Sequence, residues 1–363
     1  MYTLLADFFE NVGGFLNVFG YTTTRCGAAL CIAFAGVFLL MPKYIVFSKK
    51  WQHGGQPIRE QYLEGHVSKK GTPTLGGLLV ILSILFSCLL IGDLTNKYML
   101  ILIFTIISFG LLGFCDDYKK IKKKDTGGIS AKAKFFFQIL FSVIAVVAAN
   151  ICIESPTYSS TLTFPFFRKL VLEIGILYSI FRIIVIVGSS NAVNLTDGLD
   201  GLATIPIIFT SAVFAAFSYV IGNILMAKYL FFDYQNGAQE ICVFLSAMIG
   251  GLMGFLWYNI KPASIFMGDT GSLAFGAVLG VASTLIKSEF VLAIAGGLFV
   301  LEALSVIMQR YYFKLTHGKR IFKMAPIHHH FEKSGWSEMQ VVVRFWIISF
   351  FCACIALASL KIR

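Results

Sequence analysis

The sequence has few charged residues for its length. Asp, Glu, Lys and Arg make up only 13% of the 363 residues, whereas soluble globular proteins carry about 25%. Hydrophobic residues make up 57% of the chain, and 36 of the residues are Phe. So little polar surface cannot cover a water-soluble body of this size. The composition therefore excludes a soluble enzyme and predicts an integral membrane protein.

Several signatures of metal binding and processing are also absent. No CxxC pair occurs among the eight cysteines, which we interpret as small hydrophobic residues rather than disulfides or zinc ligands. There is no HExxH motif of a zinc enzyme. The N-terminus has no basic stretch followed by a cleavage site, so we expect no cleaved signal peptide. The net charge is +11, but the basic residues cluster between apolar runs, which favours membrane orientation over nucleic-acid binding.

Ten apolar segments are long enough to cross a bilayer, which takes about 20 helical residues. They are 24–47, 73–91, 97–114, 134–153, 169–187, 199–221, 240–258, 264–286, 290–312 and 341–360. The fifth contains Glu173 and Arg182, and the ninth contains Glu302 and Arg310; charges at such depth are paired or functional. The pattern predicts an all-α integral membrane protein with ten transmembrane helices, forming a single multi-pass domain over residues 1–363.

The connections between these segments differ in charge. The odd-numbered loops (48–72, 115–133, 188–198, 259–263 and 313–340) contain 17 Lys and Arg residues, against 3 in the even-numbered loops. Because basic loops stay in the cytoplasm, we expect the odd-numbered loops on the cytoplasmic side and both termini outside. Nearly all the chemically suggestive residues also lie in the odd-numbered loops. This one-sided distribution predicts a reaction centre in a cleft at the cytoplasmic face.

Five carboxylates on this face are candidates for chemistry. Asp116 and Asp117 are helix neighbours that point about 100° apart, so we expect them to serve different partners. The alternative is a solvated helix end paired with Lys119 and Lys120. For the lysine run 119–124, attraction to anionic lipid headgroups is the favoured interpretation.

Two further polar segments carry the other three carboxylates. Asn191 and Asn194, like Asp197 and Asp200, are three residues apart and would share a helix face; an Asn/Asp-rich turn is the alternative. Asp269 follows the eighth segment's glycine and could cap a helix, bind phosphate there, or hold Mg²⁺ through its hard oxygen. Acids, a divalent cation and lysines together are typical of a site for a polyphosphate substrate.

The histidine run 328–330 allows several interpretations. A purification tag is excluded because the run is internal. A zinc site is disfavoured, because three successive histidines on a helix cannot all face one ion. The remaining interpretation is that these histidines meet an anionic, water-borne substrate at the rim of the cleft.

Five stretches together resemble the polyprenyl-phosphate N-acetylhexosamine-1-phosphate transferases across the whole chain. They are KKGTPTLGG (69–77), GFCDDYKK (113–120), NAVNLTDGLDG (191–201), IFMGDTGSLAFG (265–276) and APIHHHFE (325–332). The TPT and HHHFE stretches are similar to the muramoyl-pentapeptide branch of that family. This resemblance implies transfer of phospho-MurNAc-pentapeptide from UDP-MurNAc-pentapeptide to undecaprenyl phosphate, giving lipid I and UMP in peptidoglycan synthesis. It also implies Mg²⁺ as cofactor, often a homodimer, and a place in the bacterial cytoplasmic (inner) membrane.

The resemblance carries over to individual positions. It implies catalytic and Mg²⁺-binding roles for Asp116, Asp117 and Asp269. It implies contacts to the phosphates, sugar, nucleotide or peptide for Lys69, Thr74, Lys132, Asn191, Asn194, Asp197, Asp200, Asn259, Phe266, His328, His329 and His330, with Phe266 stacking on uracil. Direct attack by the lipid phosphate and a covalent aspartyl route both stay open.

Two other functions compete with this one. A transferase that moves GlcNAc-1-phosphate onto the same lipid is the nearest alternative, and the HHHFE stretch argues against it. A transporter is the alternative from another class. Transporter sites lie near the membrane midplane on broken helices, whereas the polar residues of this chain gather at one face.

Overall fold

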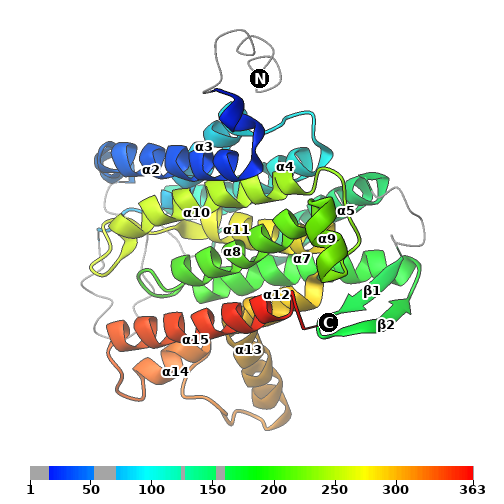
Figure 1. Ribbon diagram of the computed structural model, residues 1–363. Coiled ribbons are helices and arrows are strands. Elements are labelled where there is room, and N and C mark those ends of the chain that lie inside the picture. Colours follow the sequence, from blue (N-terminus) through cyan, green and yellow to red (C-terminus); the bar gives the residue numbers. More distant parts are fainter. Residues whose placement is uncertain (1–15, 53–70, 124–126, 153–159, 363) are drawn as a thin grey trace.

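The computed structural model describes residues 16–52, 71–123, 127–152 and 160–362 (Figure 1). The elements before the hairpin are η1 (Leu16–Gly20), α2 (Thr22–Gln52), α3 (Gly76–Ile91), α4 (Lys97–Lys123) and α5 (Ala131–Cys152). The hairpin strands are β1 (Thr161–Phe164) and β2 (Phe167–Glu173). The later helices are α7 (Ile176–Thr196), α8 (Thr204–Ile221), α9 (Ile224–Leu230), α10 (Gln239–Asn259), α11 (Gly268–Leu285), α12 (Glu289–Ala295), α13 (Gly297–Leu315), α14 (Ile327–Glu332) and α15 (Glu338–Ala358).

The described chain is a helical bundle with one small two-stranded antiparallel sheet. Seven of its helices are long and apolar enough to cross a membrane: α2, α4, α5, α7, α8, α10 and α15. The pair α12 and α13 makes an eighth if it is counted as one bent span. These helices confirm the prediction of a helical multi-pass membrane protein.

Helix α11 lies at the centre of the bundle, packed against α3, α4, α7 and α8 (Figure 1). Sixteen of its eighteen residues are buried. A Cβ atom at Gly113 of α4 would overlap the backbone of Asp269, so the two helices are in backbone contact. This contact requires glycine, and it brings the end of α4 against the start of α11.

The two ends of the bundle differ in content. The starts of α11 and α15, the end of α10 and the short helix α14 lie at one end, whereas the hairpin, α9 and the end of α15 lie at the other (Figure 1). The first of these ends contains the motifs that the sequence singled out.

The fifth predicted span, 169–187, is wrong at both ends. Residues Phe167–Glu173 form β2, which pairs with β1 in the register Thr161↔Glu173. Helix α7 begins at Ile176, after Gly175 at a φ of +55°, a backbone angle that glycine adopts easily. The helix then continues to Thr196, so most of the predicted loop 188–198 is helical.

The ninth predicted span, 290–312, is broken. Helices α12 and α13 meet at an angle of 85°. Gly296 and Gly297 stand at the junction, and glycine pairs are a known cause of sharp helix kinks. Beyond the kink, the Glu302 side chain is fully buried. Its partner lies on α14 and belongs to the candidate site.

Candidate active site

Three carboxylates meet where α4 ends and α11 begins. Asp116, Asp117 and Asp269 each offer an oxygen atom, and these atoms all lie within 4.8 Å of one another. Asp116 and Asp117 are 3% and 0% exposed, so water does little to screen their charges from each other. Such a cluster is stable only with cations close by.

The two carboxylate oxygen atoms of Asp117 differ in their contacts. Its Oδ2 accepts hydrogen bonds from the backbone N–H and the hydroxyl of Thr270, at 3.0 and 2.8 Å. Its Oδ1 is buried and has no hydrogen-bond partner among the described residues. A buried carboxylate oxygen without a partner calls for an explanation, and a cation supplies one. The donor set, three carboxylates with hard oxygen atoms, fits Mg²⁺.

Asp116 uses both of its oxygen atoms within the protein. Oδ1 accepts a hydrogen bond from the Ile129 N–H at 2.6 Å, and Oδ2 lies 2.6 Å from the ammonium of Lys120. The two neighbouring aspartates thus face different partners, as their helical spacing predicted.

Asp269 lies between two ammonium groups and an amide. Its Oδ2 accepts from Lys134 at 2.8 Å and from Lys120 at 3.0 Å, and its Oδ1 accepts from Asn194 Nδ2 at 2.8 Å. Among the residues that the structure describes, three carboxylates therefore share two ammonium groups. Within this described set the positive charge is one short of the negative charge, which again favours a cation at the site.

Of the two lysines in this cluster, the sequence analysis named Lys120 only as a partner at a solvated helix end, and it missed Lys134. The lipid-headgroup interpretation of the run 119–124 is wrong for Lys120, which bridges Asp116 and Asp269. The spacing of four residues from Asp116 to Lys120 was the available signal, because such residues share a helix face. Lys134 had no such signal, since it comes from α5. The sequence analysis predicted Lys132 as a site residue instead. Lys132 lies two positions before Lys134 on α5, and its side chain is exposed.

The asparagine motif lies on α7 and faces the same centre. Asn194 links Asp269 to Ser272, donating to the Ser272 hydroxyl at 2.8 Å. Asn191 instead pairs with Gln138 of α5, donating to its Oε1 at 2.9 Å. Gln138 is a second polar residue that the sequence analysis missed. Asp197 follows at the end of the helix and is half-buried.

Asp200 and Asn259 hold the loops that surround the centre. Asp200 Oδ2 accepts from the Ala263 N–H at 3.1 Å. Asn259 Oδ1 accepts from the Gly201 N–H at 3.0 Å, and its Nδ2 donates to the Ile265 carbonyl at 2.9 Å. Both side chains thereby fix the loop between α10 and α11.

Phe266 lies in this loop, and Thr74 lies in the segment before α3 that is hydrogen-bonded to it. Phe266 is half-buried, and its N–H donates to the Pro73 carbonyl at 2.9 Å. Thr74 is fully buried, and its hydroxyl has no hydrogen-bond partner among the described residues. A Cβ atom at Gly268 would come within 2.8 Å of that hydroxyl and 2.5 Å of Asp117 Oδ2, so Thr74 lies beside the carboxylates. The predicted residue Lys69 lies outside the described residues.

The three histidines of α14 have different surroundings. His328 is fully buried, with Nδ1 3.1 Å from Glu302 Oε1, close enough for an ion pair but without hydrogen-bond alignment. Its ring also packs against Gly198, at the end of α7. His329 Nδ1 lies 2.7 Å from Glu332, and burial lowers the pKa of His329 although Glu332 opposes this. His330 accepts from the Lys323 N–H at 3.1 Å, which closes the loop before α14.

Known proteins match this chain closely. The profile of glycosyl transferase family 4 matches residues 99–287, which include all three clustered carboxylates. The chain is 50% identical to the phospho-N-acetylmuramoyl-pentapeptide-transferase of Rickettsia bellii (strain RML369-C), over 100% of both chains. It is 51% identical to the proteins of the same name from Rickettsia rickettsii (strain Sheila Smith) and Rickettsia massiliae (strain Mtu5), again over 100% of both chains. The chain therefore belongs to glycosyl transferase family 4 and, within it, to the phospho-N-acetylmuramoyl-pentapeptide transferases.

Proposed function

We propose that the chain transfers phospho-MurNAc-pentapeptide from UDP-MurNAc-pentapeptide to undecaprenyl phosphate, giving lipid I and UMP. The observation that carries this proposal is the cluster of Asp116, Asp117 and Asp269 with Lys120 and Lys134, in a chain that belongs to this family. The lipid phosphate forms a bond to the sugar-bearing phosphorus atom, and the bridging oxygen leaves with UMP. This direct route needs no protein nucleophile.

The proposed cofactor is Mg²⁺, held by Asp117 Oδ1 with Asp116 and Asp269. When bound, it would offset the negative charge of the phosphates. Two unit charges about 4 Å apart repel by about 4 kcal/mol at an effective dielectric constant of 20, so an anionic acceptor needs such compensation near an anionic donor. Lys120 and Lys134 share Asp269 Oδ2, and both can turn from it to substrate phosphates.

The proposed topology has ten crossings and both termini outside. The seven long apolar helices, the bent pair α12–α13, the shorter apolar helix α3 and the buried helix α11 make up the ten. The charge difference of 17 against 3 favours a cytoplasmic position for the carboxylate end. The protein is then a single multi-pass domain of the bacterial cytoplasmic membrane. A homodimer is part of the proposal and can be checked by the mass of the solubilised protein.

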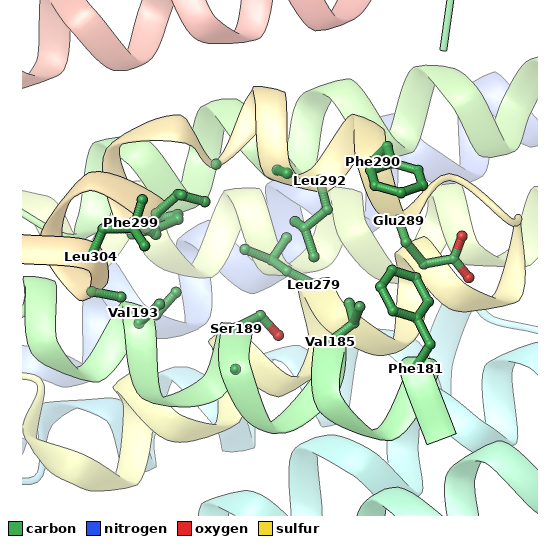
Figure 2. Close-up of a pocket in the computed structure, with 16 residues that line it drawn as sticks. Phe181, Val185, Ser189, Val193, Leu279, Glu289, Phe290, Leu292, Phe299 and Leu304 are labelled. Atoms are coloured by element: carbon green, nitrogen blue, oxygen red, sulfur yellow. The ribbon is translucent and has the colours of Figure 1, made fainter. Parts of the chain in front are cut away.

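An apolar groove between α7, α12 and α13 suits the acceptor lipid. Its volume is about 330 Å³. Figure 2 shows Phe181, Val185 and Val193 along one side and Phe290, Leu292 and Phe299 along the other, with the Glu289 carboxylate at one end. The lining is almost wholly apolar, as a polyprenyl chain requires.

The basic surroundings of the histidines suit the donor. A cavity of about 500 Å³ next to α14 is lined by Arg310, Arg320 and Lys333, together with Gln309 and Met324. The three cations can balance carboxylate or phosphate groups of a water-borne substrate. The histidines, Asp197, Phe266 and Lys132 are proposed to contact the same substrate.

The role of Lys120 can be separated from lipid attraction. Lys120→Met is expected to lower lipid I formation at least about a hundredfold, because it removes a cation from the carboxylates. Lys123→Met changes an exposed lysine of the same helix and keeps near-normal activity. The measurement is the initial rate of lipid I formation by purified protein. Equal loss in both variants would contradict a specific role of Lys120 and assign the effect to the positive charge of the whole lysine run.

We propose that the buried contact between Glu302 and His328 positions α14, and with it the histidine run, for the donor. His328→Ala is expected to raise KM for the nucleotide sugar and lower kcat, with the Mg²⁺ requirement unchanged. Glu302→Gln keeps the shape of the partner but removes its charge, and a smaller loss of the same kind is expected. Loss of all divalent-cation binding in His328→Ala would instead make the histidines metal ligands.

A comparison of donors tests the function. Purified protein is supplied with undecaprenyl phosphate and either UDP-MurNAc-pentapeptide or UDP-GlcNAc, and lipid products are identified by mass. The expected result is product from the first donor only. Product from UDP-GlcNAc alone would support the GlcNAc-1-phosphate transferase, and vesicle uptake without lipid-linked product would support a transporter.

A further inference from the structure

Two cysteines from different helices meet at the end of the bundle opposite the carboxylates. Cys26 lies in the first turns of α2, and Cys242 lies in the first turn of α10. Their Sγ atoms are 3.3 Å apart, although 216 positions separate them in the sequence. Cys26 is half-buried, whereas Cys242 is 8% exposed. The two thiols therefore form a contacting pair with one accessible member.

Polar contacts hold the two helices in register around this pair. The Thr22 hydroxyl donates to Gln239 at 2.6 Å, and Arg25 pairs with Glu240 at 2.5 Å. Further along, a Cβ atom at Gly250 would overlap the backbone carbonyl of Leu30, so the helix backbones touch. A disulfide needs Cα atoms about 4.4–6.8 Å apart, and only closely packed helices provide that separation.

We infer that Cys26 and Cys242 form a redox-active dithiol that closes to an intramolecular disulfide. Sulfur atoms 3.3 Å apart must approach by only about 1.3 Å to form the bond, within the range of side-chain rotation. With the proposed topology, this end of the bundle faces outward, where disulfides form and persist. No sequence motif could indicate the pair, because the two cysteines are 216 positions apart.

The reaction is a thiol–disulfide exchange with a disulfide-bearing oxidant. The Cys26 thiolate, the accessible one, attacks a sulfur of the oxidant, forms a mixed disulfide and releases one thiol. The Cys242 thiolate then attacks the Cys26 sulfur and releases the second thiol. Two electrons pass to the oxidant, and the two protons of the cysteines end on the two released thiols.

The disulfide would join the outer ends of α2 and α10. It would restrict their separation in the unfolded chain and so stabilise the fold. Neither helix supplies a clustered carboxylate, so the rate of transfer should not depend on the state of the pair.

The test uses purified, reduced full-length protein in detergent, treated with oxidised glutathione. After denaturation, alkylation with a maleimide and mass measurement count the free thiols. We expect two of the eight thiols to be protected from alkylation after oxidation, and a reductant to make them reactive again. Digestion of the oxidised protein should give one pair of disulfide-linked peptides, which contain Cys26 and Cys242. Cys26→Ser or Cys242→Ser abolishes the protection, whereas Cys31→Ser, an exposed position on α2, keeps it. Eight alkylated thiols after oxidation, or protection unchanged in Cys26→Ser, would overturn the inference.

The side of the membrane is tested separately. Oxidised glutathione does not cross membranes, so it should close the pair when added outside spheroplasts and leave it open when added to inverted vesicles. Closure only in inverted vesicles would overturn the outward placement. The transfer rate is recorded on the same oxidised and reduced samples. A pair that fails to close in protein of full activity overturns this inference and leaves the proposed transferase function standing.

Discussion

Asp269→Asn is expected to lower the rate of lipid I formation about a thousandfold or more, while the protein still inserts and folds. Asp269 is the carboxylate that α11 contributes to the cluster, beside Asp116 and Asp117 of α4. Its Oδ2 accepts hydrogen bonds from the ammonium groups of both Lys120 and Lys134. The neutral side-chain amide of Asn cannot offset the charge of two ammonium groups, and it binds a divalent cation more weakly than a carboxylate does. The measurement is the initial rate with undecaprenyl phosphate and UDP-MurNAc-pentapeptide.

Matched variants sharpen this prediction. Asp116→Asn and Asp117→Asn are expected to give losses of similar size, because all three carboxylates belong to one cluster. Asp233→Asn changes an exposed aspartate outside the cluster and should keep near-normal activity. A folding control is the elution of each variant as a single species in detergent. Near-normal activity of Asp269→Asn in Mg²⁺ would rule out the proposed role of this residue.

Removal of divalent cations is expected to stop transfer. Excess EDTA should reduce lipid I formation to the background level, and added Mg²⁺ should restore it. The physical reason is the charge balance of the site, where the described part of the chain places three carboxylates against two ammonium groups. The free oxygen of Asp117 marks where the missing charge belongs. Full activity in EDTA, with EDTA-treated protein free of metal by elemental analysis, would contradict this expectation.

The amino-acid pattern predicted the helical, multi-pass nature of the fold because hydropathy reports directly on burial in lipid. The same pattern did not predict where a helix starts late or is interrupted. The predicted span 169–187 began inside β2 (Phe167–Glu173), which pairs with β1, and α7 begins only after Gly175. The kink at Gly296 likewise leaves hydropathy unchanged.

The carboxylates of the site were predictable, and most of their partners were not. Asp116, Asp117 and Asp269 stand in recognisable motifs at helix ends on one face. Gln138 and Lys134 come from α5, which carries no motif, and only the packing of α5 against α4 and α7 brings them to the centre. The Glu302–His328 pair depends on the kink before α13, so hydropathy alone could not assign a partner to Glu302.

The most direct measurement of the central claim is Mn²⁺ binding, as a probe for Mg²⁺, followed by electron paramagnetic resonance. Wild-type protein is expected to bind one Mn²⁺ per chain, to release it when Mg²⁺ is added in excess, and to lose affinity at least about tenfold in Asp269→Asn. His328→Ala should bind Mn²⁺ as the wild type does. Equal binding by wild type and Asp269→Asn would contradict the claim that the three carboxylates hold the cation.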